Sequence, residues 1–129
     1  MHLGVYVVAN SFGEVFDFNG KCLSNPGIDL QGLVDIVSDS ENPVIKGGLG
    51  DSNTTVGAVI TNAVLTNQQA SYIAQSANFG FASRIYPYST GYDGDTVFAV
   101  SSNSAKCPLD ELAFMARVAA ETAVISIFR

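Results

Sequence analysis

Residues 54–63 read TTVGAVITNA, a run of β-branched and small residues without a charge. β-branched side chains favour extended backbone, and an uncharged strand is typical of the middle of a sheet, where it is covered by protein. The run includes the small residues Gly57 and Ala58. We therefore expect a buried central strand here, around which the other elements are arranged.

The segment that follows this strand predicts a helix, a strand and a second helix. Thr66 is a favourable N-cap, and the apolar residues of 70–81 recur at helical spacing. Residues 96–101 are expected to form another strand, and Pro108 opens a final helix that runs through residue 127.

The segment that precedes the central strand begins with two short apolar runs at residues 3–9 and 14–18. We expect these runs to pair as a β-hairpin. Asn19-Gly20 favours a tight turn, so a third short pairing is expected around residues 21–23.

Residues 24–53 are interrupted by proline and glycine, and apolar residues appear only in the stretch 30–37, so a loop or a short helix is expected there. Connections of this length inside a compact domain are often functional or disordered. The elements together predict an α+β fold, with a sheet of four or five strands and two helices on one face. The other face would then be uncovered, and we expect a partner chain or a lost segment to supply the missing layer.

Composition narrows the function classes. The 129 residues carry a formal charge of -6 and fit a single domain, residues 1–129. An acidic chain without a basic stripe is a poor partner for nucleic acid or membrane surfaces, and no apolar run is long enough to span a bilayer.

Cys22 and Cys107 lack metal-ligand spacing, so we expect free thiols, a cytoplasmic location and neither metal nor cofactor. His2 is the only histidine, which excludes a Ser/His/Asp triad within the chain.

The junction Asn53-Thr54 offers nucleophilic chemistry. If this bond were broken, Thr54 would carry both a hydroxyl nucleophile and its own α-amine, which titrates near pH ~8 and can act as general base. Before cleavage the same hydroxyl could attack the Asn53 carbonyl and form an ester that water hydrolyses. The alternative is that the two threonines only begin a strand.

Two carboxylates flank a glycine at Asp93-Gly94-Asp95. Such a motif can position a hydrogen-bond acceptor, bind a cation or form a tight turn, and the spacing alone favours the turn. The following residues supply none of the further oxygen ligands that a calcium loop needs.

Several stretches in order resemble the family of DmpA-type aminopeptidases, which includes β-peptidyl aminopeptidases and nylon-oligomer hydrolases. Residues 53–63 are similar to the start of that family's small subunit. Residues 84–87, RIYP, and 92–100, YDGDTVFAV, look like its later motif, and residues 7–13, VVANSFG, resemble the end of its large subunit.

The resemblance implies an αββα sandwich, also found in ornithine acetyltransferases, in a protein that cleaves itself before Ser or Thr and then hydrolyses short peptides or amino-acid amides. Thr54 would be the nucleophile and Asn53 the new C-terminus. Asn10 would match the asparagine that donates to the oxyanion. Asp93 and Asp95 would match the acidic pair that orients the nucleophile in the nylon-hydrolase branch. Homo-oligomers are usual in the family.

Family members are much longer, and a lysine used near their nucleophile has no counterpart here. The resemblance therefore divides the chain into residues 1–53, like the end of a large subunit, and residues 54–129, like a small subunit, and implies a C-terminal portion of a larger fold. Two other readings stay open. The chain could be an inert truncated fragment that needs a complementary chain, or an acyltransferase of the ornithine acetyltransferase type, although the Asp-Gly-Asp-Thr motif favours the hydrolase.

Overall fold

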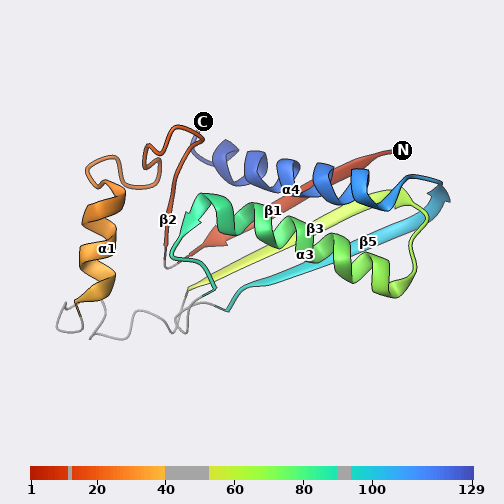
Figure 1. The fold of residues 1–129 in the computed structure, drawn as a ribbon, viewed down its shortest axis with the longest axis horizontal. Coiled ribbons are helices and arrows are strands. Elements are labelled where there is room, and N and C mark those ends of the chain that lie inside the picture. Colours follow the sequence, from red (N-terminus) through yellow and green to blue (C-terminus); the bar gives the residue numbers. More distant parts are fainter. Residues whose placement is uncertain (12, 40–52, 90–93) are drawn as a thin grey trace.

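A computed structural model describes residues 1–11, 13–39, 53–89 and 94–129 of the chain. Its main sheet has three strands in the order β1 (Leu3–Asn10), β3 (Thr54–Ala63), β5 (Thr96–Ala105). β1 pairs antiparallel with β3, whereas β5 pairs parallel with it, so the sheet is mixed. The central position expected for residues 54–63 is confirmed (Figure 1).

Two long helices cover one face of this sheet (Figure 1). α3 (Asn67–Arg84) connects the parallel strands β3 and β5, and α4 (Leu109–Ser126) packs on α3 and β1. The predicted start of α3 is confirmed, because the Thr66 hydroxyl accepts the Gln69 amide while the Gln69 side chain accepts the Thr66 amide. α4 begins directly after Pro108, as expected.

The core lies between the sheet and these helices. It is built from aliphatic and aromatic side chains of the sheet and of the two helices that face each other, and burial of such side chains contributes about 1.5–3 kcal/mol each. The largest fully buried members are Phe81, Ile73, Ile85 and Leu112, each 0–1% exposed.

The opposite face of the sheet carries exposed apolar side chains. Every second residue of the three strands points to this face, and none of the elements that the structure describes covers these side chains. The uncovered face expected from the sequence is thus confirmed, while the central strand is buried on its helix side only. The exposed members are Tyr6, Val8, Val56, Ile60, Phe98 and Val100, which are 42–74% exposed.

The expected hairpin between residues 3–9 and 14–18 is wrong. β2 (Glu14–Val15) pairs antiparallel with β4 (Ile85–Tyr86), a strand that the sequence did not suggest, and β1 gains its eight partners from β3 instead. β2 lies beside the end of α3, where the amide of the following residue, Phe16, donates to the Arg84 carbonyl at 2.7 Å. In the described residues, the expected sheet of four or five strands is therefore a three-stranded sheet and a separate two-stranded one.

The turn at Asn19-Gly20 is confirmed, since Gly20 has a φ of +83° and Phe16 bridges to Cys22. Beyond this turn lies α1 (Leu30–Ser38), so of the loop and the short helix that the sequence allowed at residues 30–37, the helix is the one that forms. Leu33 of α1 packs in a small second cluster with Phe16 and Cys22. None of the helices that the structure describes is long and apolar enough to cross a membrane.

Candidate functional site

The candidate nucleophile and the candidate oxyanion donor lie opposite each other at one end of the sheet. Asn10 is the last residue of β1 and Thr54 the first of β3, and the two are register partners. In an antiparallel pair, opposite side chains share a face with Cβ atoms about 4.5–5.5 Å apart. The alternation along the strands puts both side chains on the uncovered face of the sheet.

The two adjacent threonines face opposite sides of β3. Thr54 is partly exposed on the uncovered face, whereas Thr55 is 0% exposed on the helix side. The Thr55 hydroxyl has no hydrogen-bond partner within the described residues. Of the two hydroxyls, the one on Thr54 is therefore the one that a substrate can reach.

The Asp95 carboxylate connects the start of β3 to the segment that follows β4. Its Oδ1 accepts the Thr55 amide at 2.9 Å, and its Oδ2 accepts the Ser89 amide at 3.1 Å. A carboxylate that binds two backbone amides holds both segments in one geometry. Asp95 thus binds the residue that directly follows Thr54, and it lies at the same end of the sheet as Asn10.

The other carboxylate expected at the site, Asp93, lies outside the described residues. Within the described ranges, no three His, Cys, Asp or Glu side chains come together in a way that could hold a metal ion.

Sequence reasoning missed a contact at the Asn53–Thr54 bond. The Gly94 amide donates to the Asn53 carbonyl oxygen at 3.0 Å. Gly94 also lies beside the Thr54 hydroxyl, because a Cβ built on it would be 3.6 Å from Thr54 Oγ1. The sequence indicates a turn at Asp93-Gly94-Asp95. It carries no signal that the Gly94 amide bonds to Asn53, which lies 41 positions earlier.

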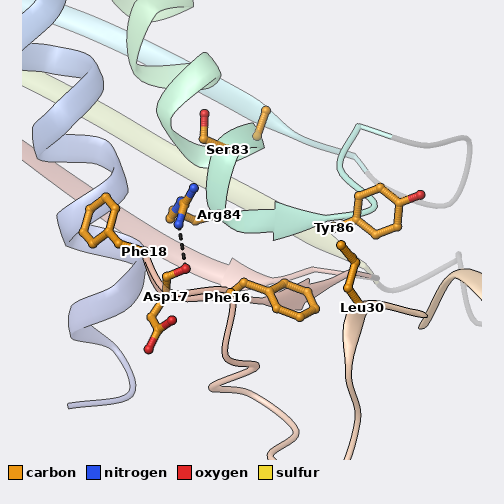
Figure 2. Close-up of a pocket in the computed structure, with 9 residues that line it drawn as sticks. Phe16, Asp17, Phe18, Leu30, Ser83, Arg84 and Tyr86 are labelled. Carbon is orange, nitrogen blue, oxygen red and sulfur yellow. Dashed lines mark hydrogen bonds between the residues drawn. The ribbon is translucent and has the colours of Figure 1, made fainter. Parts of the chain in front are cut away.

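A separate hollow of about 300 Å³ lies beside β4 and the C-terminal end of α3 (Figure 2). Arg84 lies at its side, where its Nη1 donates to the Asp17 carbonyl at 2.7 Å and its guanidinium lies 4.9 Å from the centre of the Phe18 ring. These contacts tie the end of α3 to the turn after β2, so the structure explains Arg84 as an anchor. The other sides of the hollow include Phe16, Leu30 and Tyr86.

Comparison with known proteins supports one family over the length of the chain. The model of peptidase family S58 matches residues 1–128. An uncharacterized aminopeptidase of Mycobacterium leprae is 30% identical over 81% of this chain, and a 6-aminohexanoate-oligomer endohydrolase of Paenarthrobacter ureafaciens is 32% identical over 79% of it. An uncharacterized aminopeptidase of Mycobacterium tuberculosis is 28% identical over 96% of it.

These matches cover 30% of the first two relatives and 38% of the third, so the chain spans about a third of the length of the curated relatives it matches. The family expected from the motifs at residues 7–13, 53–63, 84–87 and 92–100 is confirmed by the match over nearly the whole chain. The chain belongs to peptidase family S58.

Proposed function

We propose that this chain holds the self-cleavage site and the nucleophile of an amidohydrolase acting on short peptides or amino-acid amides. The observation that carries the proposal is the pairing of Thr54 with Asn10 on the uncovered face of the sheet, where a hydroxyl and a side-chain amide lie opposite each other. The named relatives, aminopeptidases and an amide-oligomer hydrolase, support the same substrate class.

In the proposed reaction, Thr54 supplies both nucleophile and base. Once the Asn53–Thr54 bond is broken, the free α-amine of Thr54 accepts the proton of its own hydroxyl as that oxygen attacks the substrate carbonyl. The substrate amine leaves with a proton, and water then hydrolyses the Thr54 ester. The Asn10 amide donates to the oxygen that becomes negative in each tetrahedral intermediate.

Asp95 acts in this proposal as a positioning residue. Its two bonds to the Thr55 and Ser89 amides hold the backbone directly after the nucleophile. A displacement of about 1 Å at a reacting group can cost a hundredfold in rate, so such an anchor matters to catalysis. Asp93 remains the expected second member of the acidic pair.

The uncovered face suggests how the site is completed. We expect it to pack against a second sheet, as in the αββα sandwich that the resemblance implies, supplied by a segment like the remainder of the longer relatives. Apolar side chains such as Tyr6, Val8 and Phe98 are suited to a sheet-on-sheet core. The proposed partners are therefore a complementary large-subunit segment and further copies of the same protein.

A matched pair of isosteric variants tests the nucleophile. Thr54→Val should lower the hydrolysis of an aminoacyl anilide or a 6-aminohexanoate oligomer by at least ~10³-fold, because it removes the attacking oxygen. Thr55→Val removes the neighbouring hydroxyl, which faces the helices, and should retain turnover. Turnover retained in Thr54→Val would contradict the assignment, and products formed only with an added amine acceptor would favour the acyltransferase.

A further inference from the structure

The bond proposed to break already has a hydrogen-bond donor on its carbonyl oxygen. The Gly94 amide nitrogen lies 3.0 Å from the Asn53 oxygen. Effective oxyanion donors lie about 2.7–3.1 Å from the position that the oxyanion occupies. The Gly94 N–H thus already donates to the carbonyl oxygen from which the oxyanion would form.

Self-cleavage puts negative charge on this same oxygen. Thr54 Oγ1 attacks the Asn53 carbonyl carbon, and a C–O bond forms that closes a five-membered ring. The former carbonyl oxygen becomes an oxyanion attached to that ring. The C–N bond to Thr54 then breaks, and the proton lost by the hydroxyl ends on the Thr54 nitrogen. Water hydrolyses the resulting ester, which leaves a carboxylate on Asn53 and restores the hydroxyl of Thr54.

We propose that the Gly94 backbone N–H is the oxyanion donor of the self-cleavage step, a role that rests on the proposed function of Thr54. The donor is next to both reacting groups, because a Cβ on Gly94 would lie 3.6 Å from Thr54 Oγ1 and 3.9 Å from the Asn53 oxygen. A side-chain amide such as that of Asn10 then serves the substrate reaction, while Gly94 serves the precursor.

The Gly94 amide is held in place by the residue that follows it in the chain. Asp95 follows Gly94 directly and binds the amides of Thr55 and Ser89. Because Asp95 is bonded to Thr55, the residue after the nucleophile, the Gly94 donor keeps a fixed position relative to β3. Such preorganisation is what makes oxyanion donors effective. The arrangement also selects the bond, since the Gly94 amide is directed at the Asn53 carbonyl.

Removal of one N–H tests the role of Gly94. The full chain is made by cell-free translation, and pieces corresponding to residues 1–53 and 54–129 are followed over time by mass spectrometry. Gly94→Pro and a chain with glycolic acid at position 94 both lack the N–H, and the second keeps the shape of glycine. Gly94→Ala keeps the N–H, and its methyl group makes only ordinary contacts, so it is the matched comparison.

Loss of this donor should slow cleavage by about 10²–10³-fold in the glycolic acid chain and in Gly94→Pro, while Gly94→Ala cleaves at least ~10-fold faster than either. Circular dichroism and thermal melting of each chain report whether it is folded. A folded glycolic acid chain that cleaves at the wild-type rate would overturn the role of Gly94 alone. A wild-type chain that stays intact would instead overturn the proposed function, and with it this inference.

Discussion

At the scale of single residues, the two hydroxyls that begin β3 have opposite environments. The Thr55 hydroxyl is buried and has no partner in the described part of the chain, and an unsatisfied buried hydroxyl costs about 1–3 kcal/mol. Thr55→Val should therefore raise the free energy of unfolding by about 1 kcal/mol, whereas Thr54→Val, on the exposed face, should change it by less than ~0.5 kcal/mol. Denaturant titration of both variants measures this, and a loss of stability in Thr55→Val would contradict the assignment of its hydroxyl.

The turn after β2 makes stability depend on pH. The Lys21 amide, then the Asn19 amide, donate to Asp17 and hold the pKa of its carboxyl below the ordinary 3.8, although desolvation opposes this. A lowered pKa stabilises the fold above pH ~4, and that contribution is lost as pH falls through the folded-state value. The difference in Tm between wild type and Asp17→Asn should thus be constant near neutrality and shrink below pH ~4. An unchanged difference at pH 3 would speak against these bonds.

At the scale of elements, the contact between α3 and α4 depends on a glycine. A Cβ on Gly80 would lie 2.3 Å from the Arg117 carbonyl oxygen and 2.8 Å from the Ala120 Cβ. Alanine normally gains about 1 kcal/mol over glycine within a helix, but a backbone carbonyl cannot yield to such a clash. Gly80→Ala should therefore destabilise the protein by about 1–3 kcal/mol, while Ser71→Ala on the exposed side of α3 should not. Equal stability of Gly80→Ala and wild type in denaturant titration would refute this packing.

The elements that the sequence predicts well are those with local signals. The β-branched run of β3, the Thr66 capping box and Pro108 before α4 each act within a few residues of the element they define. Strand pairing is different, because β2 meets β4 some 70 positions later and two-residue strands carry no periodicity. The candidate site likewise has parts with local sequence signals and parts that depend on long-range contacts.

Asn10, Thr54 and Asp95 carry side chains that a family motif can mark, and the structure brings all three to one end of the sheet. The amide of Gly94 belongs to the backbone, which every residue shares, so no motif could identify it as a partner of Asn53. Tertiary contacts of the backbone are the part of this site that required a structure.

At the scale of the whole molecule, the uncovered sheet face should control association. Val8 is 74% exposed and Phe98 57% exposed on this face, and apolar patches of this kind bind apolar dyes and other protein surfaces. The chain alone should therefore self-associate with rising concentration, and Val8→Thr combined with Phe98→Ser should reduce both association and dye binding. Sedimentation of wild type as a monomer that binds no dye would contradict an open apolar face.

The central claim is that Thr54 breaks the bond to Asn53 and then acts as nucleophile, and the intact mass of the purified chain after incubation at neutral pH tests it most directly. We predict that wild type yields two pieces, residues 1–53 and residues 54–129, and that Thr54→Val stays whole. A wild-type chain that remains uncut, or a Thr54→Val chain that is cut at the same bond, would contradict the claim.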